Sequence, residues 1–210
     1  SLSLGVVGAS HAGTYAVTVS NALGTASGSA TLTLEPVVAW GQSSSGQTYV
    51  NHLPLTNAVA VSAGYNYNLA LKADGTAFSW GGVSTLPSAN SNFAAVAAGY
   101  SQRLGLRSNG TVLAWGSGTL PVAPANLTNA ASIHVAKHFS SVVMNCFAIR
   151  SNSTLVGWNN NGDYYSGGTL TNIPAGLVGV IGVAAGANHA LALKSDGSIT
   201  PSCGIALIRA

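Results

Sequence analysis

A stretch of about 20 residues recurs along this chain of 210 residues. It reads AGYNYNLALKADGTAFSWGG at 63–82, AGYSQRLGLRSNGTVLAWG at 98–116 and, in part, AGANHALALKSDGS at 185–198. Each copy joins short apolar runs through an Asp-Gly or Asn-Gly step. A period of about 40 residues with such turns is typical of a bladed or solenoidal array. The repeat therefore predicts an all-β architecture, whereas function in such folds depends on the loops.

Four units can be recognised because each carries a tryptophan at the end of an apolar strand: Trp40, Trp80, Trp115 and Trp158. Their turns hold dipeptides that accept the positive φ of tight hairpins, at 74–75, 109–110 and 196–197, with Asn152-Ser153 in the third unit. Leu-Pro or Ile-Pro recurs in the links, at 53–54, 86–87, 120–121 and 173–174, where proline ends a strand ladder. We expect about four blades of four strands each.

The string VVAWGQSSSGQ at 37–47, followed by VAVSAGYNYNLALKADGT at 59–76, resembles the regulator-of-chromosome-condensation repeat in its short bacterial version. The resemblance extends over about 37–198 and is weakest in the third unit. It implies four-stranded blades of a β-propeller, commonly with seven blades. Because this chain shows four repeats, a closed ring, an open arc, a partial array and a homodimer that completes a propeller are all compatible with it.

Residues 1–35 depart from the repeat. The run AGTYAVTVSNALGTASGSATLTLE at 12–35 resembles the last two strands of an immunoglobulin-like domain, with Tyr15 at the tyrosine-corner position. An isolated hairpin is marginally stable in water. We therefore expect it to dock on a blade, in a fragment of a larger surface protein. The predicted domains are 1–35 and 36–210, with an irregular tail at 199–210.

Charged residues make up 5% of the chain, against about 25% in ordinary globular domains. Four of the seven basic residues precede the blade turns: Lys72, Arg107, Arg150 and Lys194. Three others are too few for the six or more phosphates of a typical DNA site. We therefore predict neither nucleic-acid binding nor a membrane span, and expect an extracellular or cell-surface protein of bacterial type.

Catalytic signals gather in the third unit, which is longer than the others at 136–149. His134 and His138 bracket its start, Ser140 and Cys146 are nearby nucleophiles, and Asp163 is the acid without an evident turn or linker role. These residues define an alternative function: a secreted hydrolase of a small ester, amide or lactone, optionally metal-assisted. No cofactor is predicted, and a calcium or zinc ion is compatible with the sequence.

The sequence favours a non-enzymatic role, as a binding or adhesion scaffold for a protein or cell-surface ligand. The resemblance implies recognition by aromatic side chains of blade-end loops. The candidates are Tyr65, Tyr67, Tyr100, Phe139, Tyr164 and Tyr165. Cys146 and Cys203 are compatible with a disulfide or with two free thiols.

Overall fold

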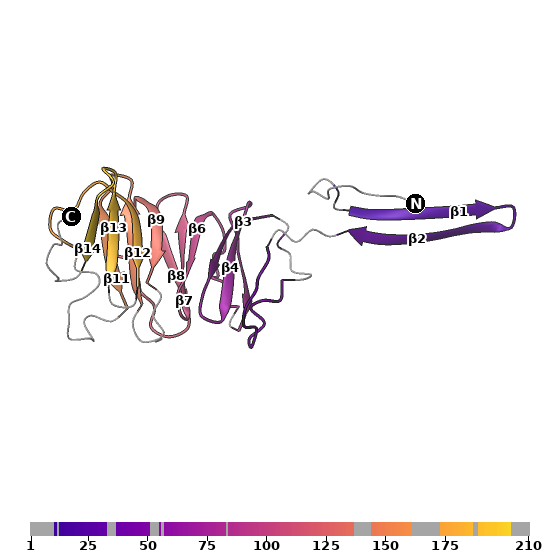
Figure 1. The fold of residues 1–210 in the computed structure, drawn as a ribbon, viewed down its shortest axis with the longest axis horizontal. Coiled ribbons are helices and arrows are strands. Elements are labelled where there is room, and N and C mark those ends of the chain that lie inside the picture. Colours follow the sequence, from indigo (N-terminus) through magenta and orange to yellow (C-terminus); the bar gives the residue numbers. More distant parts are fainter. Residues whose placement is uncertain are drawn as a thin grey trace.

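The computed structural model describes residues 11, 13–32, 37–50, 55, 57–82, 84–136, 144–160, 173–186 and 189–202. These residues form an antiparallel hairpin followed by four antiparallel three-stranded sheets (Figure 1). The hairpin consists of β1 (Gly13–Asn21) and β2 (Gly24–Leu32). We call the four sheets blades 1 to 4. Blade 1 consists of β3 (Ala58–Ala63), β4 (Tyr67–Lys72) and β5 (Ala77–Gly81), and blade 2 of β6 (Phe93–Ala98), β7 (Gln102–Arg107) and β8 (Val112–Gly116). Blade 3 consists of β9 (Ala130–Val135), β10 (Asn145–Arg150) and β11 (Leu155–Asn159), and blade 4 of β12 (Val180–Ala185), β13 (Ala190–Lys194) and β14 (Ile199–Ser202).

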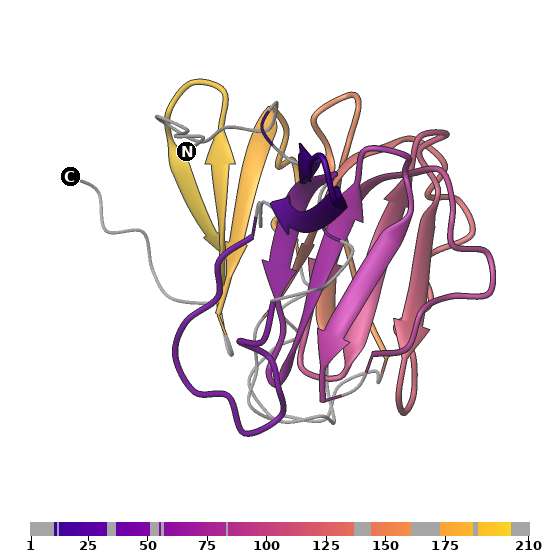
Figure 2. The same ribbon diagram turned by 90° about the vertical axis from the view of Figure 1, so that its right-hand side faces the viewer.

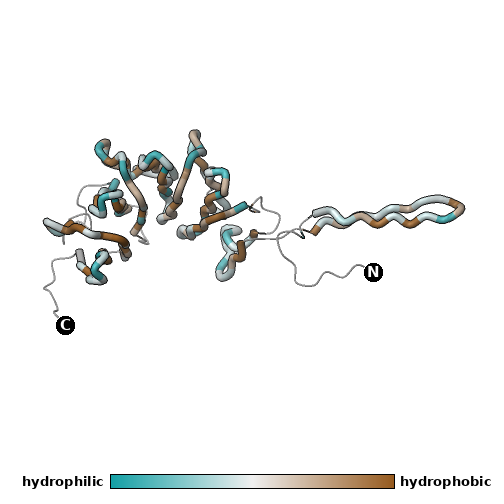
Figure 3. The backbone as a smooth tube through the Cα atoms, turned by 90° about the horizontal axis from the view of Figure 1, so that it is seen from above, coloured by the Kyte–Doolittle hydropathy of each residue, from teal (hydrophilic) through white to brown (hydrophobic). Residues whose placement is uncertain are grey.

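The blades follow one another in chain order, so that blades 1 and 4 lie at opposite ends of the array (Figure 1). Seen from above, they are placed along an arc (Figure 3). Among the described residues the arrangement is an open array, one of the alternatives that the repeat count left open. Each blade contacts its neighbours in sequence through β3, β6, β9 and β12 and the strands beside them.

Within the described residues each blade has three strands, which corrects the expectation of four. The described parts of the links between blades do not pair as strands. Pro87 and Pro121 have no N–H for a ladder. Two of these links instead cover the tryptophan of the following blade: the indole N–H of Trp115 donates to the Thr85 carbonyl at 3.1 Å, and that of Trp158 to the Pro121 carbonyl at 2.9 Å.

Most of the apolar core lies between neighbouring blades, and one further cluster packs Val50 and Leu55 on Ala70 and Trp80 of blade 1. Between blades 1 and 2, Leu69 and Leu71 of β4 pack against Phe93 and Trp115 of blade 2. A second cluster joins blades 2 and 3, and two smaller ones join blades 3 and 4. Period-2 alternation explains this arrangement, because successive residues of a strand face the preceding and the following blade in turn.

Backbone hydrogen bonds reinforce the same contacts. The turn of each blade offers a carbonyl to the first strand of the next: Phe93 N–H donates to Gly75 O at 2.9 Å, and Ala130 N–H donates to Gly110 O at 3.0 Å. Val180 N–H donates to Ser153 O at 2.9 Å in the third junction. The turns therefore connect neighbouring blades as well as the strands of one blade.

The hairpin extends away from the blades instead of docking on them (Figure 1), and Figure 2 shows it nearly end-on in front of them. Nearly all of its residues are exposed. Val17 and Val19 face the small residues Gly28 and Ala26 across the ladder, so its apolar face offers little area to bury. Figure 3 shows the same contrast, since apolar stretches recur in the blades while much of the hairpin is pale. The predicted boundary at residue 35 lies outside the described residues.

Replacing Gly110 with Ala should destabilise the array more than replacing Gly176 with Ala. Both glycines have a left-handed φ, of 79° and 76°, so alanine is strained at either position by about 1–2 kcal/mol. A Cβ at Gly110 would also lie 2.7 Å from the Thr128 carbonyl oxygen, whereas a Cβ at Gly176 meets nothing within 4 Å. Urea unfolding of both variants measures the difference. Equal losses would show that the contact between turn and next blade adds no stability.

Candidate functional site: the loop end of the blades

Each blade has two chemically different ends. At the turn end, the strand-connecting turns are closed by an Asp or Asn side chain: Asp74 Oδ1 accepts from the N–H of Thr76 at 2.9 Å and from its hydroxyl at 2.6 Å. Asn109, Asn152 and Asp196 repeat this arrangement in the other blades. These hydrogen bonds lower the pKa of both Asp74 and Asp196. The two carboxylates therefore have structural roles in their turns, as the sequence predicted.

The opposite end, which we call the loop end, carries stacked tyrosines. Tyr65 lies in the loop between β3 and β4, and Tyr100 in the equivalent loop between β6 and β7. Their ring centroids are 4.4 Å apart with an interplanar angle of 22°. Tyr65 is 64% exposed and Tyr100 is half-buried. We call these two residues the tyrosine pair.

The loop that carries Tyr100 is held from below by Tyr67. Tyr67 is 1% exposed, and its hydroxyl donates to the carbonyls of Gly99 at 3.2 Å and Gln102 at 2.8 Å. Burial raises the pKa of Tyr67 to about 12, against a smaller lowering by Arg103. The phenol is therefore a neutral donor at ordinary pH. Tyr67 was predicted as a binding residue, and the structure assigns it instead a positioning role beneath the tyrosine pair.

Arg103 completes this support. Its side chain is fully buried, its guanidinium carbon lies 3.8 Å from the centroid of the Tyr67 ring, and Nη1 donates to the Ser101 carbonyl at 3.0 Å. Burial lowers the pKa of Arg103. The loop at 99–102 is thus bound to a side chain on each of two neighbouring blades. This order is present before any ligand arrives, and pre-organisation reduces the entropy lost on binding.

Sequence reasoning missed Arg103, which it counted only as one of the three basic residues that do not precede a blade turn. Its position was the available signal, because it stands inside a strand between Gln102 and Leu104 rather than beside a turn. A charged residue within a strand that is otherwise buried requires a partner in the fold.

The remaining predicted aromatics, Phe139, Tyr164 and Tyr165, lie outside the described residues. So do His138, Ser140 and Asp163 of the hydrolase hypothesis, which therefore stays a prediction. His134 is described: it is half-buried on β9, and its Nε2 lies 3.2 Å from the Ser132 hydroxyl. Burial lowers the pKa of His134, because it disfavours the protonated imidazole.

Cys146 is a free and fully buried thiol. Its Sγ lies 3.9 Å from the Met144 carbonyl, and burial raises its pKa far above the ordinary value. A thiol must be deprotonated and reachable to attack a substrate. Cys146 meets neither condition, so it is not the nucleophile that the hydrolase hypothesis considered.

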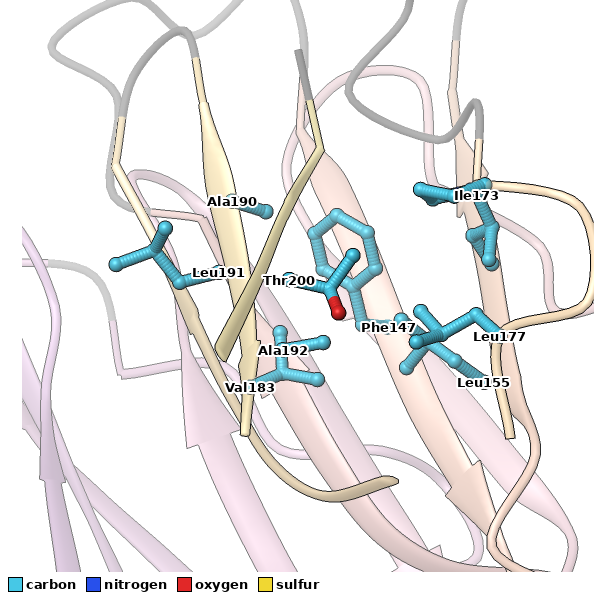
Figure 4. Close-up of a pocket in the computed structure, with 10 residues that line it drawn as sticks. Phe147, Leu155, Ile173, Leu177, Val183, Ala190, Leu191, Ala192 and Thr200 are labelled. Atoms are coloured by element: carbon cyan, nitrogen blue, oxygen red, sulfur yellow. The ribbon is translucent and has the colours of Figure 1, made fainter. Parts of the chain in front are cut away.

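An apolar pocket lies between blades 3 and 4 (Figure 4). Phe147, Leu155, Leu177 and Val183 contribute to it, and Thr200 is the polar member of its lining. In the described part of the chain, no three His, Cys, Asp or Glu side chains come together as a metal site. The same part contains no helix long and apolar enough to cross a membrane. The pocket therefore offers apolar contact and no acid–base pair.

The open array of three-stranded sheets defines the chain as an all-β repeat protein with β-propeller blades, and solved structures agree. The ectodomain of the Physcomitrella patens receptor kinase CR4 matches with a TM-score of 0.59 at 23% identity, over 75% of this chain and 43% of that chain. Human WBSCR16 matches with a TM-score of 0.53 at 19% identity, over 70% and 47%. Prp20p of Saccharomyces cerevisiae matches with a TM-score of 0.51 at 22% identity, over 69% and 43%. These similarities establish the fold, and this chain spans less than half the length of each.

The repeat itself has a more specific match. Residues 58–82, which form blade 1 with its loop and turn, match the Regulator of chromosome condensation (RCC1) repeat. The resemblance seen in the sequence is confirmed for this repeat. No curated protein sequence matches the chain.

Replacing Tyr67 with Phe should lower the free energy of unfolding by about 1–3 kcal/mol, because the buried Gly99 and Gln102 carbonyls lose their shared donor. Tyr49→Phe is the matched control, since this tyrosine is 71% exposed and should change stability by less than about 0.5 kcal/mol. Chemical denaturation measures both. A Tyr67→Phe variant as stable as the control would contradict the positioning role.

The stability of the protein should fall as the pH drops below the ordinary histidine pKa of 6.5, because folded His134 resists protonation while the unfolded chain accepts a proton. The loss proceeds until the pH passes the lowered pKa of the folded state. In the His134→Asn variant, the free energy of unfolding should fall less steeply as the pH drops. Ser132→Ala should retain it, because burial and not the hydroxyl lowers the pKa. A slope unchanged by the replacement of His134 would contradict this assignment.

Proposed function

We propose that this chain is a protein-interaction scaffold that binds a partner protein at the loop end of its blades. The tyrosine pair is the observation that carries the proposal. The two stacked rings come from two neighbouring blades, Tyr65 is exposed, and the loop of Tyr100 is held by Tyr67 and Arg103. Tyrosine is enriched among the residues that dominate binding energy at protein interfaces, because it combines apolar area with a polar hydroxyl and few rotatable bonds.

The surroundings of the pair suit a protein ligand better than a charged small molecule. Asn66 and Ser101 follow the two tyrosines and provide neutral hydrogen-bonding groups beside the rings. The charged residues Lys72, Asp74, Lys194 and Asp196 belong to the turn end. A neutral rim around aromatic anchors is the pattern of protein interfaces with little charge at their centre.

Proteins of similar fold support this class of function. Yeast Prp20 has been crystallised with Kap60 bound, and Prp20p is described by its binding properties to Gsp1p and histones. Those partners are properties of the yeast protein. For this chain we propose that its RCC1-type blades also bind a protein.

We further propose that the chain acts outside the cell or at its surface in a bacterium. The hairpin supports this placement, since the Tyr15 hydroxyl donates to the His11 carbonyl at 2.8 Å, as the tyrosine of an immunoglobulin-like corner does. An immunoglobulin-like hairpin joined to a weakly charged array fits an adhesion or recognition module of a larger surface protein.

Replacing both Tyr65 and Tyr100 with Ser should weaken partner binding by at least about tenfold, which corresponds to about 1.4 kcal/mol. The partner is first captured through a photo-crosslinking amino acid placed at Tyr49, which leaves the tyrosine pair intact, and is then purified for a titration. Lys72→Ser, at the turn end, is the matched control and should bind like the wild type. The proposal fails if no saturable partner is captured, or if the control loses binding while the double variant keeps it.

A further inference from the structure

The tyrosine pair brings two oxidisable phenols into contact. The ring centroids of Tyr65 and Tyr100 are 4.4 Å apart, and the ring planes are inclined by 22°. The two residues belong to equivalent loops of successive repeats, so their contact arises because blades 1 and 2 are neighbours. The other aromatic stacks among the described residues each pair a phenylalanine with a tryptophan. In the described part of the chain, stacking therefore joins two phenols at this one place.

Two phenols held together can be coupled by oxidation. A one-electron oxidant removes an electron from a phenol, and the hydroxyl proton passes to water. Two phenoxyl radicals then combine through their Cε atoms, the ring carbons next to the hydroxyls, and form a C–C bond. The hydrogen of each bonded Cε leaves as a proton, and a proton returns to each oxygen to restore the phenols. Two C–H bonds are thus broken, one C–C bond is formed, and two electrons and two protons pass to the oxidant.

The exposure of the two rings matches the needs of this reaction. Tyr65 is 64% exposed, so an oxidant in solvent can reach its phenol and water can take its proton. Tyr100 is half-buried and stacks on that ring. One ring is therefore open to the oxidant, and the second is held beside it where the radicals can meet.

Tyr67 is protected from the same reaction by its environment. It is 1% exposed, and its hydroxyl donates to the carbonyls of Gly99 at 3.2 Å and Gln102 at 2.8 Å. A phenol that is oxidised must release its proton, and amide carbonyls are too weakly basic to accept it. Oxidation is therefore directed to the tyrosine pair, while Tyr67 continues to hold the loop.

The sulfur atoms that would compete for an oxidant are buried. Met144 is 3% exposed and Cys146 is fully buried, and oxidation of sulfur depends on exposure. The exposed aromatic competitors include Trp40, which is 86% exposed, and Tyr49, which is 71% exposed. Neither of them stacks on a tyrosine among the described residues. They can be oxidised, but they have no second phenol in contact with which to couple.

We propose that the tyrosine pair is a modification site, at which a one-electron oxidant such as a peroxidase with hydrogen peroxide joins Tyr65 to Tyr100 as a dityrosine cross-link. One hydrogen peroxide accepts both electrons and both protons and is reduced to two water molecules. The product joins the loops of blades 1 and 2 covalently. The reaction depends on the geometry of the pair, and it requires neither a bound partner nor the placement outside the cell that we propose above.

Treatment of the whole purified chain with peroxidase and hydrogen peroxide tests this site. We expect a product of the mass of one chain less two hydrogen atoms, with dityrosine fluorescence and a proteolytic peptide pair that joins Tyr65 to Tyr100. The yield should stay constant on about tenfold dilution, since dilution does not change the effective concentration of a pair within one chain. The product should unfold at a higher urea concentration than the untreated chain, because the cross-link restricts the unfolded state.

Phenylalanine variants identify the two phenols. Tyr65→Phe and Tyr100→Phe each keep an aromatic ring and remove one hydroxyl, so each should lower the yield of coupling within one chain by about tenfold or more. Tyr49→Phe is the matched control and should couple like the wild type. Circular dichroism verifies that each variant is folded. Wild type oxidised in urea should lose the preference for joining Tyr65 to Tyr100, because unfolding separates the rings.

Three results would overturn the proposal. The first is a wild-type chain in which Trp40 is oxidised and no peptide joining Tyr65 to Tyr100 appears. The second is a Tyr49→Phe control that loses coupling as strongly as Tyr65→Phe. The third is a yield that falls with dilution, which would show coupling between chains. All of these results are obtained without a partner, so they are distinguishable from a failure of the proposed protein interaction.

Discussion

The structure depends on the contact between one blade and the next. A three-stranded sheet of five or six residues per strand has two faces and cannot cover either of them alone. In this chain a pair of large apolar residues on the middle strand of one blade is covered by the tryptophan and inner strand of the following blade. Burying one such side chain is worth about 1.5–3 kcal/mol, so each junction contributes several times the value of a typical hydrogen bond. Stability in such arrays is approximately a sum over neighbouring units.

This dependence explains how the chain folds with so few charges. Hydrogen bonding within and between the blades relies on short polar groups. Asn and Asp side chains close the turns, and turn carbonyls accept from N–H groups of the next blade. Ion pairs are expendable in this design, since exposed pairs contribute about 0–1 kcal/mol. The Lys194–Asp196 pair at 3.1 Å spans a single turn of blade 4 and connects no blades.

Much of the fold could be predicted from the sequence because the residues that determine it recur in successive repeats. The turn dipeptides, the alternation around Leu69 and Leu71 and the recurring tryptophans each reflect a local rule. The structure agrees for the turns, the alternation and Trp80, Trp115 and Trp158, whereas Trp40 lies outside the four blades. Non-local features escaped prediction. The stacking of Tyr65 on Tyr100 joins loops of two blades, and the burial of Tyr67 depends on Arg103 from the neighbouring sheet. No spacing within one repeat contains that information. The expected docking of the hairpin was wrong for a related reason, because strand propensity does not reveal whether a matching surface exists.

The loop end and the array ends follow from the same repetition in different ways. Where blades are neighbours, their equivalent loops come side by side, and a residue that would be solitary in one repeat becomes half of a pair; this brings Tyr65 onto Tyr100. Where a blade has no neighbour, the residues that the repeat would bury are exposed; this leaves Trp40 and Leu191 at the surface. The first arrangement produces the surface at which we propose that a partner protein binds. The second leaves apolar side chains exposed on the first and last described blades.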